Sequence, residues 1–219
     1  MLKEEILASV GKAGIIAVIR ANSISRSIEV AQACIKGGVK GIELTYTVPE
    51  AAKAIKLLLE TNSEHSDVLI GAGTILTAFD ANEAINAGAE YIVSPTFDEQ
   101  VALTCNARNI NYFPGCFTPA EVYHAKKYGI GLVKVFPASV VGPGMIRELH
   151  GPFPDTRIMP TGGINLSNIT DWLEAGAYAV GIGGSLVGNN ETSLDTITHN
   201  AEQFIKKIQG WHKMITEGD

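Results

Sequence analysis

Residues 15–46 read IIAVIRANSISRSIEVAQACIKGGVKGIELTY and hold two short apolar, β-branched runs on either side of a segment with helical periodicity. At the start of that segment, Ser23 or Ser25 can accept the free amide hydrogens of a first helical turn. The Gly37-Gly38 pair can end the helix. Strand, helix and strand in this order predict a parallel βαβ unit.

The same unit recurs along the whole chain. The predicted strands are Ile15–Arg20, Gly41–Tyr46, Val68–Thr74, Tyr91–Pro95, Asn111–Cys116, Leu132–Pro137, Arg157–Thr161 and Ala179–Gly183. The following helices are expected to begin near Pro49, Thr77, Asp98, Thr118, Gly144, Asn165 and Asp195. Eight βα units in 219 residues fit a (β/α)8 TIM barrel, which takes roughly 200–250 residues.

The N-terminal residues mix charged and apolar side chains at helical spacing, which predicts an extra helix before the first strand. We therefore expect residues 1–219 to form one α/β domain, a single (β/α)8 barrel with an extra N-terminal helix. An open doubly wound sheet is the alternative. In the barrel, functional residues belong at the carboxyl ends of the strands and in the loops that follow.

Composition narrows the class of protein. The net charge is −6, and the 17 Lys and Arg residues are scattered, which argues against nucleic acid and anionic membranes as partners. The chain has no signal-peptide pattern and no apolar run of about 18 residues, so a cytoplasmic protein is expected.

Spacing of cysteine, histidine and glycine argues against metals and cofactors. The three cysteines, Cys34, Cys105 and Cys116, form no CxxC and are expected in the core, and the five histidines show no HxxxH or HExxH spacing. Glycine motifs for a dinucleotide are incomplete, because Leu76 and Leu186 stand where a third glycine is needed. Neither a metal nor a cofactor is expected.

Lys134 occupies the middle of the predicted strand Leu132–Pro137. Alternate residues of a strand face opposite sides, so Lys134 and Phe136 point into the barrel if the valines between them face the helices. An ammonium group is costly to desolvate there, which favours the neutral amine that attacks a ketone to form an imine. A structural lysine paired with a carboxylate is the other interpretation.

Glu43 lies in the predicted strand Gly41–Tyr46, where alternation puts it inside the barrel together with Thr45. A carboxylate in the same barrel as Lys134 suits a general base, because imine chemistry needs several proton transfers that one positioned group can relay through water. A salt bridge without a catalytic role fits the same two residues. The sequence leaves both interpretations open.

Two glycine-rich segments, TGGI (161–164) and GIGGS (181–185), follow the predicted seventh strand and end the eighth. Small residues leave amide hydrogens accessible, and the loops after the last two strands form the usual phosphate site of this fold. Close packing of strand and helix is the alternative reason for these glycines. The predicted phosphate-binding residues are Gly162, Gly163, Gly184 and Ser185.

Other side chains at strand ends can shape a pocket. Arg20 ends the first predicted strand, and its guanidinium is suited to a carboxylate or a phosphate. Thr74, Pro95 and Thr161 also fall at strand ends, where hydroxyls and a rigid proline can contribute.

Eight ordered segments, spread over the chain, carry a resemblance to a known family. They are AVIRANS (17–23), GGVKGIELTYTVPEA (37–51), GAGTILT (71–77), AEYIVSP (89–95), FPGCFTPAE (113–121), LVKVFPA (132–138), GPFPDTRIMPTGGIN (151–165) and AVGIGGSLV (179–187). In these segments and their order the chain resembles the 2-keto-3-deoxy-6-phosphogluconate (KDPG) and 4-hydroxy-2-oxoglutarate (KHG) aldolases. These are class I aldolases of the Entner-Doudoroff route.

The resemblance implies a Schiff-base reaction. Lys134 would form a carbinolamine and an imine with a 2-keto group, and Glu43 would shuttle protons through water while pyruvate leaves by way of an enamine. With KDPG as substrate, the second product would be glyceraldehyde 3-phosphate. No cofactor is implied, and the family's usual assembly is a homotrimer.

The resemblance also implies further site residues. Thr74 would contact the region of the pyruvate carboxylate, while Pro95 and Phe136 would wall the pocket. The far end, including the phosphate, would be bound by Thr161, Gly162, Gly163 and Ser185.

One position departs from the family's pattern, because many members carry an arginine where this chain has Thr47. We therefore hypothesise that Arg20 takes over the anchoring of the substrate. Substrate choice among KDPG, its galactose-derived isomer and KHG stays open. Open too are a phosphosugar isomerase or epimerase on the same barrel, a metal-dependent aldolase and a non-catalytic phosphosugar-binding protein.

Overall fold

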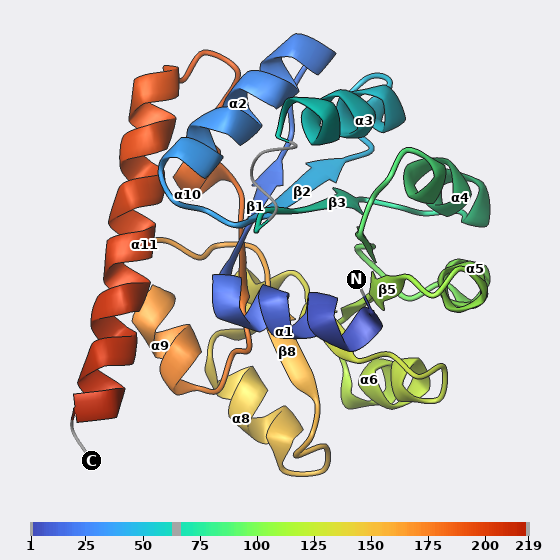
Figure 1. Cartoon of the computed structure of the whole chain (residues 1–219). Helices are drawn as coiled ribbons and strands as arrows, with labels where there is room; N and C mark the ends of the chain where they lie inside the picture. Colours follow the sequence, from blue (N-terminus) through green and yellow to red (C-terminus); the bar gives the residue numbers. More distant parts are fainter. Residues whose placement is uncertain (1, 63–66, 218–219) are drawn as a thin grey trace.

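The computed structural model describes residues 2–62 and 67–217, and in these ranges parallel strands form a ring surrounded by helices (Figure 1). One sheet has the order β5-β4-β3-β2-β1-β9, and a second has the order β6-β7-β8. A bridge between Thr161 and Gly181 joins β8 to β9, and the Lys134 amide donates to the Pro114 carbonyl between β5 and β6. The two sheets therefore close into the predicted (β/α)8 barrel.

The strands lie where the sequence predicts them, with slightly shorter bounds. They are β1 (Ile15–Ile19), β2 (Gly41–Thr45), β3 (Leu69–Gly73), β4 (Tyr91–Val93), β5 (Asn111–Phe113), β6 (Gly115–Cys116), β7 (Leu132–Val135), β8 (Arg157–Pro160) and β9 (Val180–Ile182). The predicted fifth strand is observed as two pieces, β5 and β6, because Pro114 has no amide hydrogen to give to a neighbouring strand.

The barrel helices follow the strands. They are α2 (Ile24–Lys36), α3 (Ala51–Thr61), α4 (Ala78–Asn86), α5 (Glu99–Ala107), α6 (Pro119–Lys126), α8 (Gly144–His150), α9 (Ile169–Glu174) and α11 (Leu194–Glu217). The Ser23 hydroxyl accepts from the Arg26 amide at 3.2 Å, so the expected cap of α2 is confirmed.

Two short helices were not expected, α7 (Ala138–Val141) and α10 (Gly184–Val187). The helix expected near Asn165 begins only at Ile169. Asn165 instead forms a local turn, in which its side chain accepts from the Ser167 amide at 2.9 Å.

Alternation along the strands separates two cores. The outward residues pack against the helices, and the inward residues form a second cluster within the barrel. The extra N-terminal helix α1 (Lys3–Ala13) is also present, and Ile6, Leu7 and Val10 pack onto the inward cluster. Figure 1 shows α1 lying across the middle of the ring. It covers the amino-terminal end of the barrel, so the carboxyl ends of the strands form the opposite, uncovered end.

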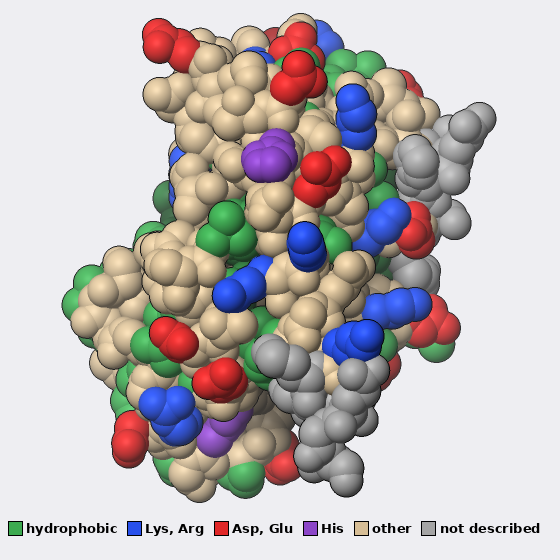
Figure 2. Space-filling model, turned by 90° about the vertical axis from the view of Figure 1, so that its left-hand side faces the viewer, with side chains coloured by type: hydrophobic (Ala, Val, Ile, Leu, Met, Phe, Trp, Pro, Cys, Tyr) green, Lys and Arg blue, Asp and Glu red, His purple; other side chains and the backbone are tan. Residues whose placement is uncertain are grey.

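The surface carries charges of both signs. On the face formed by α11, acidic and basic side chains are interspersed (Figure 2). Among the described residues, no helix is long and apolar enough to cross a membrane. The three cysteines are buried, as expected, and burial raises the pKa of each thiol to about 12.

We predict that Leu7→Ala lowers the free energy of unfolding by about 3 kcal/mol, because it leaves a cavity between α1 and the barrel interior. Leu7 is 2% exposed and is close to Gly131 and Tyr178. Leu2→Ala, at a position that is 65% exposed, is the matched control and should change the stability by less than about 0.5 kcal/mol. Urea denaturation measures both, and equal effects would contradict the role of α1 as a packed cover.

Candidate active site

Lys134 lies in β7 and points into the barrel, where it is 3% exposed. Its neighbours Val133 and Val135 face the helices, while Leu132 belongs to the inward cluster. The Nζ atom of Lys134 lies 5.1 Å from the centre of the Phe136 ring, within the range of a cation–π contact. Lys134 and Phe136 therefore share the inward side of this segment, as alternation predicts.

Glu43 lies in β2 and is fully buried. Its Oε1 atom is 3.9 Å from Nζ of Lys134, which is longer than a hydrogen bond. Neither carboxylate oxygen has a hydrogen-bond partner among the described residues. Burying a carboxylate without hydrogen bonds costs free energy. A water molecule or a bound ligand that contacts both Glu43 and Lys134 would supply the missing hydrogen bonds.

The barrel interior is shaped to hold the Glu43 carboxylate. Gly73 faces inward on the neighbouring strand β3, and a Cβ atom there would collide with the carboxylate. At Gly71, a Cβ atom would collide with the Tyr91 ring. Tyr91 is fully buried, and its hydroxyl donates to the Ile42 carbonyl at 2.6 Å, directly before Glu43.

The hydroxyl of Tyr91 stays protonated and able to donate. Burial, and secondly the negative charge of Glu43, hold the pKa of Tyr91 well above its usual value. Tyr91 therefore supports the backbone on which Glu43 stands. The sequence analysis did not single out Tyr91 or Gly73, although alternation along strands β3 and β4 puts both on the inward side.

A pocket of about 320 Å³ opens at the carboxyl ends of the strands. It contains most of the predicted substrate and phosphate residues. Its lining is formed by Val18, Arg20, Phe136, Thr161, Gly162, Gly163, Ile164, Asn165, Gly181, Gly183, Gly184 and Ser185. We call it the glycine-lined pocket.

The loop after β8 turns sharply at one wall of this pocket. Gly162 and Gly163 have φ angles of 102° and 76°, which side chains with a Cβ atom rarely adopt. At Gly184, which also lines the pocket, a Cβ atom would meet no atom within 4 Å and would extend into open space. The Ser185 hydroxyl donates to the Ile164 carbonyl and so ties the two glycine segments together.

Arg20 is the only charged residue in the described lining of the glycine-lined pocket. Its guanidinium lies beside Gly183, where a Cβ atom would be 3.7 Å from Nη1. Thr161, which directly follows β8, lines the same pocket and has a buried Oγ1 atom with no hydrogen-bond partner within the described ranges. A guanidinium, an unpaired hydroxyl and two glycine segments form a setting suited to an anion.

Two predicted residues, Pro95 and Thr74, lie outside this lining. Pro95 lines a neighbouring pocket of about 290 Å³, and Phe136 is shared between the two pockets. Thr74 follows β3 and lines neither pocket, and its φ angle of 59° is unusual for a β-branched residue. Its positive φ angle and its absence from both linings distinguish Thr74 from the other predicted substrate residues.

The hydroxyl of Thr47, at the position where the resemblance led us to expect an arginine, is engaged. Thr45 donates to the Ile19 carbonyl at 2.9 Å, and the Thr45 and Thr47 hydroxyl oxygens lie 2.7 Å apart. Since the proton of Thr45 goes to the carbonyl, Thr47 is the donor between the two hydroxyls. Thr47 therefore has no proton left for a substrate carboxylate in this arrangement.

Among residues 2–62 and 67–217, no group of three or more His, Cys, Asp or Glu side chains is arranged to hold a metal ion. These residues offer the chemistry of a buried amine and carboxylate, next to a pocket whose lining is suited to an anion.

Comparison with known proteins agrees with this geometry. The family model for KDPG and KHG aldolase matches residues 6–201. The 2-dehydro-3-deoxy-phosphogluconate aldolase of Treponema pallidum (strain Nichols) is 36% identical over 172 residues, which cover 78% of this chain and 80% of that protein. The 2-dehydro-3-deoxy-6-phosphogalactonate aldolase of Escherichia coli (strain K12) is 26% identical over 196 residues, covering 89% and 94%.

A solved structure supports the same assignment. KDPG aldolase from Legionella pneumophila, with pyruvate captured at low pH as a covalent carbinolamine intermediate, matches with a TM-score of 0.81 and 29% identity. The match covers 90% of this chain and 96% of that one. The chain therefore belongs to the KDPG and KHG aldolase family of carbon–carbon lyases.

Proposed function

We propose that this protein cleaves KDPG into pyruvate and glyceraldehyde 3-phosphate through an imine on Lys134. The observation that carries the proposal is the buried pair of Lys134 and Glu43, in which the carboxylate has no hydrogen bond and stands 3.9 Å from the amine. A structural salt bridge would be expected to satisfy the carboxylate with closer and additional hydrogen bonds. In this pair the carboxylate oxygens instead keep hydrogen-bonding capacity for a water molecule or a reacting group that contacts both side chains.

In the proposed reaction, the neutral amine of Lys134 adds to the C2 carbonyl to give a carbinolamine, which loses water to form the imine. Glu43, acting through water, removes the proton of the C4 hydroxyl. The C3–C4 bond then breaks, its electrons move into the imine to form an enamine, and the aldehyde leaves. Protonation at C3 and addition of water release pyruvate and restore the amine.

The glycine-lined pocket supports a phosphorylated substrate. Its walls combine Arg20 with the glycine segments that hold Gly162, Gly163, Gly184 and Ser185. Because Arg20 lines this pocket beside Gly183, we propose that it holds the phosphate. Anchoring of the carboxylate by Arg20, in place of the arginine replaced by Thr47, is the competing hypothesis. We propose Thr161, Phe136, Pro95 and Thr74 as further substrate contacts.

Two related substrates are the alternatives. The similarity to the E. coli phosphogalactonate aldolase keeps the galactose-derived isomer as a candidate, and E. coli KHG/KDPG aldolase, 31% identical over 172 residues, keeps KHG. We also propose that residues 1–219 form one domain and that the protein assembles as a homotrimer, as the family resemblance implies.

The imine predicts a covalent adduct. Incubation with pyruvate and sodium borohydride should add a reduced pyruvate group to the peptide that contains Lys134, as measured by mass spectrometry. Lys134→Ala should abolish the adduct, because the amine is lost. Lys40→Ala, at an exposed lysine paired with Asp67, is the matched control and should keep it. No adduct on the wild-type protein would sink the proposed chemistry and favour an isomerase or a binding protein.

Glu43→Gln should separate imine formation from proton transfer. The amide has the shape of the carboxylate but cannot act as a base, so exchange of the pyruvate methyl protons with deuterium should slow by about 10²-fold or more. Exchange is followed by NMR, while borohydride trapping on Lys134 should persist. Glu50→Gln, at an exposed site, is the control. Unchanged exchange in Glu43→Gln would assign the proton transfer to another group.

Arg20→Ala should raise KM for KDPG at least tenfold, on the scale of a charged hydrogen bond of about 1.5–3 kcal/mol. If Arg20 holds the phosphate, KM for KHG should change less than about twofold, because KHG has no phosphate. An equal rise for both substrates would instead support anchoring of the carboxylate. Arg147→Ala on α8 is the exposed control, and an unchanged KM for KDPG would remove Arg20 from the site.

A further inference from the structure

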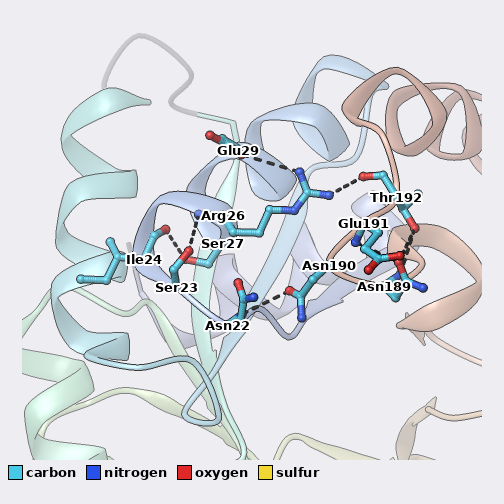
Figure 3. Close-up of polar contacts among 10 residues, drawn as sticks. All are labelled: Asn22, Ser23, Ile24, Arg26, Ser27, Glu29, Asn189, Asn190, Glu191 and Thr192. Carbon is cyan, nitrogen blue, oxygen red and sulfur yellow. Dashed lines mark hydrogen bonds and ion pairs between the residues drawn. The ribbon is translucent and has the colours of Figure 1, made fainter.

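Two segments leave the glycine-lined pocket on adjacent sides and meet again outside it. One continues from Arg20 into α2, and the other runs from Gly184 and Ser185 through α10 into the loop 188–193 before α11. Figure 3 shows side chains of both segments reaching toward each other. The strands that precede them, β1 and β9, are neighbours in the sheet.

Two hydrogen bonds cross between these segments. The Arg26 guanidinium donates through Nη2 to the Thr192 carbonyl, and the Asn22 amide donates to Oδ1 of Asn190 at 3.2 Å. Arg26 also pairs with Glu29 on its own helix, with 3.6 Å between Nη1 and Oε2. The side chains of Arg26 and Asn190 therefore both link the start of α2 to the loop before α11 (Figure 3).

The loop that Arg26 contacts is internally fixed. The Asn189 amide donates to the Thr192 hydroxyl at 3.0 Å, and the Thr192 amide donates to the Asn189 carbonyl at 3.2 Å. Gly188 donates back to the Gly184 carbonyl at 2.9 Å. These hydrogen bonds connect the Thr192 carbonyl through a closed turn to Gly184 in the pocket lining, so a shift of the carbonyl is expected to move Gly184.

The other side of the link is also fixed. The Arg26 amide is held by the cap residue Ser23, and Asn22 lies two residues after Arg20. The Arg26 side chain is 16% exposed, and its Nε atom has no hydrogen-bond partner in the described part of the chain. A poorly exposed guanidinium with an unmatched donor is costly, and an apolar side chain would fill the site without that cost.

We propose that Arg26 is a positioning residue, which sets the separation between Arg20 and the Gly184–Ser185 wall and thereby the affinity of the pocket for the substrate phosphate. The inference rests on the proposed phosphate site. An anion bound between a guanidinium and glycine backbone needs donors on both walls at once, so a small displacement of one wall weakens binding. The amine chemistry lies deeper in the barrel and does not depend on this link.

The test replaces the link and separates phosphate affinity from chemistry. Arg26→Met keeps an unbranched stem but removes the donors, and we expect KM for KDPG and the inhibition constant of inorganic phosphate to rise at least about fivefold. We expect kcat, KM for KHG and borohydride trapping of pyruvate on Lys134 to stay within about twofold, since none of these needs the phosphate wall.

Two variants serve as comparisons. Arg26→Lys keeps one donor for the Thr192 carbonyl and should recover at least half of the lost phosphate affinity. Glu29→Gln, which alters only the exposed partner of Arg26, should behave as wild type. Should Arg26→Met fail to fold, Asn190→Ala removes the second crossing bond from an exposed position, and the same selective rise in KM is expected.

The outcomes are distinct. A wild-type KM for KDPG in Arg26→Met overturns the proposal, and the same result in Asn190→Ala does so where that variant is needed. An equal rise in KM for KDPG and KHG also overturns it, because it indicates a general disturbance of the site. If the wild-type protein itself forms no pyruvate adduct and is not inhibited by phosphate, the proposed function fails instead. A selective loss for phosphorylated ligands, partly rescued by lysine, supports Arg26 as a positioning residue.

Discussion

The side chains of Lys134 and Glu43 are both buried inside this barrel with 3.9 Å between Nζ and Oε1, and the residues around them support that placement. Removing an amine and a carboxylate from water costs several kcal/mol per ion unless close hydrogen bonds offset it, and Glu43 has none within the described residues. The barrel supports the pair by steric means instead. Gly73 leaves the space that the carboxylate occupies, and Tyr91 supports the backbone before it.

The difference between the two ends of the barrel is related to the burial of Lys134 and Glu43. At the amino-terminal end, α1 and the inward apolar residues close the barrel interior. Towards the carboxyl ends, Phe136 contacts Lys134 and also lines the glycine-lined pocket. The Lys134 amine therefore has a buried, largely apolar environment at one end of which the glycine-lined pocket begins, separated from the amine by Phe136. The helix that precedes the first strand is thus part of the architecture of the site and not an appendage.

Much of this could be predicted from the sequence, because periodicity reports which side of a strand faces inward. The facing of Lys134 and Glu43 follows from alternation alone, and the caps at Ser23 and Thr118 follow from local hydrogen bonding. Features that depend on distant neighbours could not be predicted. The hydroxyl of Tyr91 bonds a carbonyl 49 residues away, and Arg26 bonds one 166 residues away. Neither pairing leaves a local pattern in the chain.

The absence of an arginine at position 47 is compatible with the proposed reaction. The proposed substrate, KDPG, carries a carboxylate at one end and a phosphate at the other, while the described lining of the glycine-lined pocket supplies one cation, Arg20, beside Gly183. Formation of a protonated imine at C2 would create a positive charge one bond from the carboxylate. The positive charge of the imine would then offset the negative charge of the substrate carboxylate. The phosphate of KDPG is at the other end of the molecule from the imine, so under this proposal a fixed cation such as Arg20 is needed in the glycine-lined pocket.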